Sequence, residues 1–271
     1  MKVGLSDKRI SAAVMVIHAN SDAIAFQPMK LVPGYRALSS AIEQRIVRGE
    51  LQAGMLLPTE LELAQQLGVN RSTVREAIRQ LEQEGFLVRQ GGRRLYVRLP
   101  GAEDVGARTA RALMLQQVTF HELWQVAMVL EPQAAELAAA AIDAPGLTAL
   151  RTLAAQLEQC HDEGGTAQRH AELDVAFHAQ VAAASRNRVL MMAREPINLL
   201  YRPTLVRLQR VLPQTQSRNV QAHTRLIEAI AAGDGRGAAE WMRKHLVDFQ
   251  RGYALAGIPM DTALEPDHLP A

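Results

Sequence analysis

Four side chains in the second half of the chain have the chemistry of metal ligands. Asp174 and His178 lie four residues apart in a helical pattern, so both can point into one cavity, and His223 and His245 follow on later segments. One carboxylate with three imidazoles suits zinc, nickel, iron or manganese. The spacing alone is weakly specific, because a histidine on a helix is more often a packed or surface residue. We interpret His170, four residues before Asp174, as a surface residue rather than a further ligand.

Arg71 and Arg75 have the chemistry to read DNA bases. They lie four residues apart, so they share one face of a predicted helix whose apolar face carries Val74, Ile78 and Leu81. An arginine can donate two hydrogen bonds to guanine, which discriminates between bases by about 1–3 kcal/mol. The alternative is that both arginines are surface residues that pair with glutamates such as Glu76 or Glu82.

Further polar side chains surround these arginines. Asn70, Ser72 and Thr73 can reach phosphates or base edges at the positive end of the helix dipole. Gly92, Arg93 and Arg94 lie in a basic turn that can enter an adjacent groove or contact phosphate.

Local signals predict the elements that position these residues. The apolar spacing predicts a helix over 35–47, a capping box of Thr59 and Glu62 begins a second helix that Gly68 ends, and Asn70 caps a third that stops at Gly85. Two extended runs, 86–89 and 95–98, form a hairpin around the turn 90–93. This order predicts a winged helix-turn-helix, whose third helix suits the major groove of DNA.

The rest of the chain is rich in alanine and leucine and has no convincing strand pattern. Breaks at 143–146, 164–165, Asn187 and Gly233 predict about six helices between Val105 and Ala256, with Pro196 kinking or splitting one of them. The fold class is therefore mainly α: a winged helix-turn-helix followed by an all-α bundle. We expect a loosely ordered extension over 1–33, a DNA-binding domain over 34–100, a helical domain over 102–258 and a tail over 259–271.

Composition agrees with a two-domain protein that binds DNA through its first domain. The chain has 271 residues, of which 48% are hydrophobic, and a net charge of +2. Ten arginines face seven glutamates over 33–98, whereas basic and acidic residues balance over 102–258. The single cysteine, Cys160, allows no internal disulfide, and no apolar stretch is long enough to span a bilayer, so we expect a cytoplasmic protein.

The first domain resembles the GntR family of transcriptional regulators. The resemblance rests on the stretches 57–64, 67–78 and 81–85, which read LPTELELA, LGVNRSTVREAI and LEQEG. It implies a homodimer on a short pseudo-palindromic operator, with Arg71 and Arg75 among the DNA contacts. The chain departs from the family where Leu61 replaces a usual arginine and Arg94 replaces a second wing glycine.

The second domain resembles the effector domain of the FadR-type branch, called the FCD domain. The resemblance rests on 174–178, 184–187, His223 with 229–234, and 245–246, and with the first domain it spans roughly 35–255. It implies that Asp174 and the three histidines hold a metal whose coordination a small carboxylate effector completes. Ala127 stands where the family often has an arginine, so another cation must bind the carboxylate; Arg202 and Arg207 are the alternatives.

Two other functions remain open for the helical domain. It could be a dimerisation module without a ligand, or a metal-dependent enzyme in which a bound water acts as nucleophile. The enzyme is disfavoured because the chain lacks a Walker loop, an HExxH and a GxSxG sequence, and has only one Glu-x-x-His pattern, at 158–161. We therefore expect a regulator and no enzyme.

Overall fold

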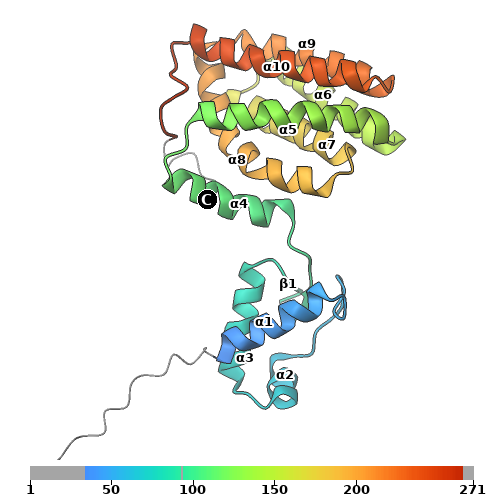
Figure 1. The fold of residues 1–271 in the computed structure, drawn as a ribbon, viewed down its shortest axis with the longest axis vertical. Helices are drawn as coiled ribbons and strands as arrows, with labels where there is room; N and C mark the ends of the chain where they lie inside the picture. Colours follow the sequence, from blue (N-terminus) through green and yellow to red (C-terminus); the bar gives the residue numbers. More distant parts are fainter. Residues whose placement is uncertain (1–33, 93, 265–271) are drawn as a thin grey trace, which may run out of the picture.

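The computed structural model describes residues 34–92 and 94–264, and this part of the chain is mainly helical, as predicted (Figure 1). It contains ten helices and one two-stranded sheet, in the order α1 Gly34–Val47, α2 Glu60–Leu67, α3 Arg71–Gln83, β1 Leu87–Gln90, β2 Arg94–Val97, α4 Ala102–Leu115, α5 Phe120–Ala141, α6 Ala144–Asp162, α7 Ala167–Ala184, α8 Arg188–Val211, α9 Thr215–Ala231 and α10 Gly235–Leu255. The extension predicted over 1–33 lies outside the described residues, as does the tail beyond 264.

The helix-turn-helix forms where the local signals predict it. The Thr59 side chain accepts a hydrogen bond from the Glu62 backbone, and the Glu62 carboxylate accepts one from the Thr59 backbone at 2.8 Å, so the predicted capping box begins α2. Gly68 ends α2 with φ of 64°, a left-handed conformation that glycine adopts without strain. Asn70 occupies the N-cap position of α3, but its side chain makes no capping hydrogen bond, so the predicted cap is only positional.

The core of this first unit orients α3. Val74, Ile78 and Leu81 of α3 pack with apolar residues of α1 and of the sheet, namely Ile42, Ile46, Leu87, Leu95 and Val97. The strands lie within one residue of the predicted runs and pair in antiparallel register, with Leu87 opposite Val97 and Gln90 opposite Arg94. Because the apolar face of α3 is buried in this way, its opposite face is held outward.

The second unit contains seven helices, where the sequence predicts about six. The missed break lies between α4 and α5, where Gln117 adopts a left-handed φ of 57° and Thr119 caps the next helix, without a glycine or proline to signal a stop. A second missed break, at Pro213, separates α8 from α9, whereas α8 is not split and runs through both Pro196 and Pro203. Proline disfavours a helix interior but does not forbid it where packing supplies the compensation.

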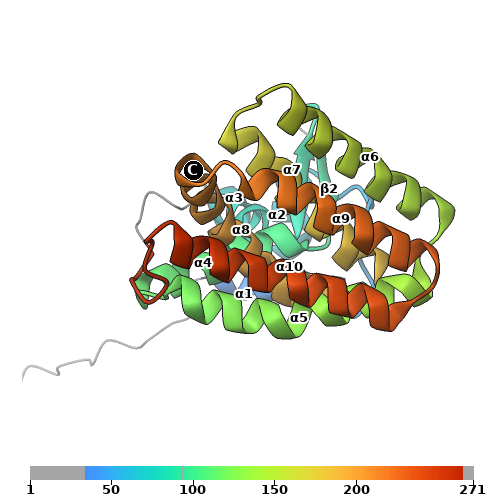
Figure 2. The ribbon, with the colours of Figure 1, turned by 90° about the horizontal axis from the view of Figure 1, so that it is seen from above.

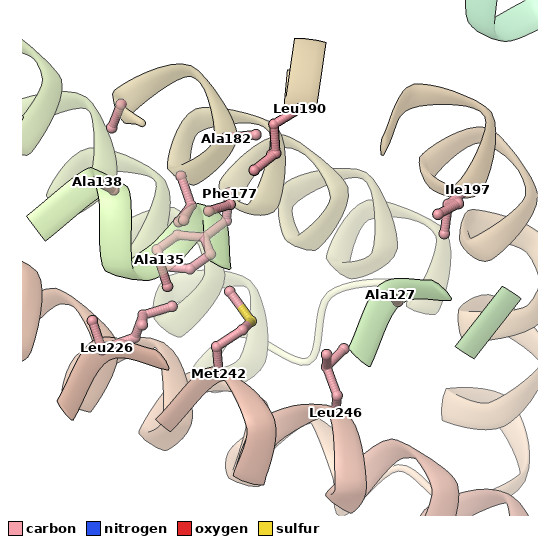
Figure 3. Close-up of a cluster of buried hydrophobic side chains, with 14 of the residues drawn as sticks. Ala127, Ala135, Ala138, Phe177, Ala182, Leu190, Ile197, Leu226, Met242 and Leu246 are labelled. Atoms are coloured by element: carbon pink, nitrogen blue, oxygen red, sulfur yellow. The ribbon is translucent and has the colours of Figure 1, made fainter. Parts of the chain in front are cut away.

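Small residues let the helices of the bundle approach closely. Ala135 and Ala138 of α5 pack with Phe177 of α7 and Met242 of α10 in a buried cluster (Figure 3). From above, α10 runs between α5 and α9, and it contacts both (Figure 2). This packing brings side chains of α7, α9 and α10 to one buried centre.

The ends of the bundle connect to other parts of the chain. Helix α4 lies between the first unit and the rest of the bundle, where it packs on α8 (Figure 1). The backbone of Leu264 donates a hydrogen bond to Val118 at 3.0 Å, so the described end of the chain returns to the start of α5. No helix within 34–264 is long and apolar enough to cross a membrane.

Candidate DNA-binding helix and buried histidine cluster

The exposed face of α3 carries Arg71 and Arg75, as the spacing predicts. The Arg71 side chain is 70% exposed and lies 3.5 Å from the Glu60 carboxylate, while Arg75 is exposed and forms no ion pair with any described residue. Glu76 and Glu82, the alternative partners, bind Arg79 and Arg89 instead, both at 2.9 Å. Arg71 thus pairs with Glu60 rather than with Glu76 or Glu82, and both guanidinium groups lie on one exposed surface of the molecule.

The other predicted DNA contacts differ in their accessibility. Asn70 and Ser72 are exposed, whereas Thr73 is half-buried beside Gly34. Gly92 has a positive φ of 77° in the turn of the hairpin, and Arg94 is exposed at the start of β2. Arg93 lies outside the described residues.

The four predicted metal ligands meet at the centre of the bundle. Asp174 and His178 come from α7, His223 from α9 and His245 from α10; all four are buried, and one ligand atom of each lies within 4.8 Å of the others. The arrangement could hold a metal, and its occupation stays a prediction. His170 lies outside this set. It is fully buried, so the predicted surface position is wrong. The side-chain amide nitrogen of Gln209 lies 2.8 Å from its Nδ1, within hydrogen-bond distance.

Two histidines of the cluster, His223 and His245, are in the form that binds metals. Burial, reinforced by the neighbouring His178, lowers the pKa of His245 from 6.5 to about 4, and burial lowers that of His223 well below its usual value. Both imidazoles are therefore neutral near pH 7 and keep a lone pair. His223 stacks on Phe177, with ring centroids 3.8 Å apart, and neither of its nitrogens has a hydrogen-bond partner among the described residues.

Two residues that the sequence analysis did not predict orient ligands of the cluster through hydrogen bonds. Glu131 of α5 accepts a hydrogen bond from His178 Nδ1 at 3.0 Å, which leaves His178 Nε2 facing the cluster as an acceptor. Asn219 of α9 donates to the Asp174 carboxylate at 2.6 Å. His223 Nε2 lies 3.4 Å from the Asp174 carboxylate without a hydrogen bond, and this contact together with the outer hydrogen bonds fits a metal better than a packed apolar core. In the sequence, the only indication of this role is that Glu131 is a charged residue within the alanine-rich stretch 127–139.

A buried arginine is the second feature that the sequence did not reveal. Burial alone would raise the pKa of Glu131, but the positive charge of Arg194 and the hydrogen bonds from His178 and Arg194 outweigh it and hold the pKa at about 2. Arg194 of α8 donates through Nε to Glu131, and both side chains are almost fully buried. Arg194 thus places a guanidinium group deep inside the bundle, beside the histidine cluster.

A small polar cavity connects Arg194 with the cluster. Its volume is about 20 Å³, and its polar lining consists of Glu131, Asp174, His178, Arg194, Asn198 and Tyr201. The buried Tyr201 hydroxyl has no hydrogen-bond partner in the described structure. Ala127 also lines this cavity. Arg207 lines a different cavity, which none of the four predicted metal ligands lines. Arg202 does not line the cavity beside the cluster. Neither of the two arginines that the sequence suggested as carboxylate-binding groups therefore lies in this cavity.

Comparisons with known proteins match both units. Residues 34–97 match the family model described as bacterial regulatory proteins, gntR family, and residues 122–248 match the FCD domain. A candidate regulator of the L-lactate dehydrogenase operon of Escherichia coli is 31% identical over 222 residues, which cover 78% of this chain and 84% of that protein.

Two further relatives extend the likeness. The transcriptional regulator LutR of Bacillus subtilis is 28% identical over 216 residues, with 76% of this chain and 94% of LutR covered. The solved structure of a GntR protein from Streptococcus agalactiae covers 80% of this chain and 99% of its own, with 26% identity and a TM-score of 0.57.

Proposed function

The chain belongs to the GntR family of bacterial transcriptional regulators, with a DNA-binding helix-turn-helix and a C-terminal FCD effector domain, and we propose that a small organic acid controls its affinity for operator DNA. The acid binds beside a divalent metal ion in the FCD domain. One observation carries this proposal: Arg194 and the unpartnered Tyr201 hydroxyl line the same buried cavity as Asp174 and His178.

The DNA-binding part of the proposal rests on α3. Its outer face presents Arg71 and Arg75 to base edges in the major groove, while Asn70, Ser72 and Arg94 contact the backbone or neighbouring bases. A homodimer would present two such helices to the two halves of a pseudo-palindromic operator.

Asp174, His178, His223 and His245 would hold the metal ion. These nitrogen and oxygen donors fit zinc, nickel, iron or manganese. The bound ion would supply a positive charge and a coordination position for a carboxylate oxygen. Glu131 and Asn219 keep His178 and Asp174 in the orientation that binding requires.

Arg194 supplies the cation that Ala127 cannot. Its guanidinium group has five N–H donors, and Glu131 accepts from only one nitrogen, so donors remain for a ligand carboxylate. Tyr201 adds a buried hydroxyl that has no hydrogen-bond partner within 34–92 and 94–264. A small hydroxy or keto acid matches these donors, and one relative is described as regulating an L-lactate dehydrogenase operon.

The small volume of the cavity suggests how binding reaches the DNA-binding helix. A space of about 20 Å³ holds about one or two water molecules, so an organic acid must displace side chains of the lining, to which α8 contributes Arg194, Asn198 and Tyr201. Glu195, next to Arg194, packs so closely on Gly106 of α4 that a side chain at position 106 would clash.

Helix α4 in turn contacts the first unit of the structure. Arg108 of α4 donates to the Gln83 carbonyl at the end of α3 at 2.8 Å, and Asp104 pairs with Arg98. A shift of α8 is thereby passed through α4 to the recognition helix α3. These contacts supply a physical route for coupling between effector and operator.

An operator titration with and without an acid tests the proposal. The operator is selected from random DNA, and zinc-loaded protein is titrated with it in the absence and presence of L-lactate, glycolate and pyruvate. A coupling of about 1–3 kcal/mol changes operator affinity about 5- to 150-fold. Arg194→Met should remove the change, whereas the exposed Arg188→Met should keep it.

The outcomes separate the alternatives. Operator binding that ignores every small organic acid would leave the helical domain a dimerisation module. An equal response in the Arg194→Met variant would place the effector elsewhere in the domain.

A further inference from the structure

A second cavity reaches the histidine cluster between α8, α9 and α10, and its walls are mainly apolar. Its volume is about 70 Å³, larger than the 20 Å³ of the polar cavity. The apolar lining consists of Leu205, Leu208, Leu212, Phe249, Gly252 and Leu255. Leu255 is 73% exposed, so this side of the cavity lies near solvent. Space of this size holds roughly five water molecules, and a small organic compound fits only if it extends past Leu255 toward solvent.

Two amide side chains, Asn219 and Gln209, form the polar end of this cavity. The Asn219 amide nitrogen donates to the Asp174 carboxylate at 2.6 Å, and a carboxylate accepts only, so the orientation of the amide is determined. The Asn219 carbonyl oxygen is left buried without a hydrogen-bond partner in the part of the chain that the structure describes. A buried acceptor of this kind is costly unless a donor reaches it.

The Gln209 side chain resembles that of Asn219: among the described residues, its amide nitrogen has a close partner and its carbonyl oxygen does not. Its amide nitrogen lies 2.8 Å from His170 Nδ1, which leaves its carbonyl oxygen with only a long 3.5 Å contact from Gln216. Both amides are almost fully buried. The polar end of the cavity therefore offers two carbonyl oxygens, and it calls for a ligand that donates hydrogen bonds.

The charges of the lining favour an uncharged ligand. Arg218 and Asp248 are the two oppositely charged side chains of the lining, and they lie 3.7 Å apart. No unpaired cation is therefore available among the lining residues for a carboxylate. An ammonium group is equally unsuited, because burial of a charge without a charged partner costs several kcal/mol.

We propose that this cavity is a second ligand site, distinct from the organic-acid site, and that it binds a small apolar compound with a hydroxyl group. The hydrocarbon part packs on the leucines and on Phe249, and the hydroxyl donates to the Asn219 carbonyl oxygen. The occupant also lies against His245, which lines the same cavity. The site needs no bound metal, because only one member of the histidine cluster contributes to it.

Benzyl alcohol and toluene are matched probes for this site, since they share an aromatic ring and differ in the hydroxyl. Binding to the full-length protein is measured by ligand-observed and protein-observed NMR titration. We expect benzyl alcohol to bind with a dissociation constant on the order of 1 mM. Toluene should bind about 2- to 13-fold more weakly, which corresponds to one net hydrogen bond.

Two substitutions locate the site. Gly252→Leu adds a side chain toward Leu208 and Thr215, where a Cβ atom would already lie 3.3 and 3.5 Å from their methyl groups, so it should abolish binding of both probes. Ala254→Leu, on the exposed face of the same helix, is its control. Asn219→Ala should bring the two probes to equal affinity, whereas the exposed Gln221→Ala should retain the preference.

Each outcome decides the proposal. Circular dichroism and the thermal midpoint establish that the variants are folded. Absence of benzyl alcohol binding to the unsubstituted protein, or unchanged binding in a folded Gly252→Leu variant, would overturn the site. Equal binding of toluene and benzyl alcohol would overturn the assigned hydroxyl. Loss of binding in Gly252→Leu with an intact response to organic acids would show that the two sites are separate.

Discussion

The Nε2 atoms of His178 and His245 face each other at 3.1 Å in the buried centre of the bundle. Because His178 donates through Nδ1 to Glu131, its Nε2 is an acceptor, and His245 must donate a proton there when no metal is bound. Two imidazole nitrogens that converge with a carboxylate can instead share one metal ion. This relationship makes the cluster sensitive to both pH and metal.

The metal-free protein should lose stability as the pH falls. The pKa of His245 is about 4 in the folded chain and 6.5 ordinarily, so the unfolded chain binds a proton first and stability decreases from about pH 6.5 down to pH 4. The full loss from this residue is about 3 kcal/mol. Urea denaturation at a series of pH values measures it. His245→Gln should make the profile shallower over this range, where the lowered pKa of His223 still contributes, and a variant that keeps the profile of the unsubstituted protein would contradict the assignment.

Substitution of the histidine cluster should remove the metal. His223→Ala and His245→Ala each delete one donor of the four, and the double variant should retain almost none of the metal that elemental analysis finds in the unsubstituted protein. His121→Ala, at the start of α5 and outside the cluster, is the control. Full metal occupancy in the folded double variant would eliminate the site. Lost metal with an unaltered effector response would make the metal purely structural.

The recognition helix should lose specificity when its arginines are shortened. Arg71→Ala and Arg75→Ala remove exposed guanidinium groups without touching the core, so the fold should persist while specific operator affinity falls about 5- to 150-fold per contact. Fluorescence anisotropy with operator and scrambled DNA measures the change. Arg151→Ala, exposed on α6, serves as control. Unchanged operator affinity in a folded double variant would refute this role of α3.

The wing should contribute affinity without much specificity. Arg94 is exposed at the start of β2, so Arg94→Ala should weaken binding to specific and non-specific DNA alike. The slope of log affinity against log salt concentration should decrease in magnitude by about one for the lost phosphate contact. Titrations at four salt concentrations provide the slope. A slope equal to that of the unsubstituted protein would remove Arg94 from the DNA contacts.

Removing only Arg194 from the buried ion pair should lower the free energy of unfolding more than replacing both Arg194 and Glu131. Arg194→Met leaves the Glu131 carboxylate buried opposite an apolar side chain, which should lower the free energy of unfolding by about 3–5 kcal/mol. Glu131→Gln in the same chain removes the uncompensated charge and should recover part of the loss. Urea denaturation of both variants tests this. If Arg194→Met were as stable as the unsubstituted protein, the pair would not hold α5 and α8 together.

Sequence patterns were enough to predict most of the helices, the winged helix-turn-helix and which residues could bind metal. These features depend on local chemistry: Thr59 and Glu62 form a capping box within one turn, and a spacing of four residues places Arg71 beside Arg75 and Asp174 beside His178. Family resemblance then connected Asp174 with His223 and His245.

The residues that surround those ligands could be identified only from the packing of the folded chain. Glu131 meets His178 and Arg194 only because α5, α7 and α8 pack together, and residues separated by 47 and 63 positions leave no periodic signal of such a contact. The break at Gln117 also escaped sequence analysis, because an ordinary residue adopts a left-handed conformation there under the constraint of its neighbours. Contacts between distant segments depend on how helices are packed, and that packing is a property of the whole chain.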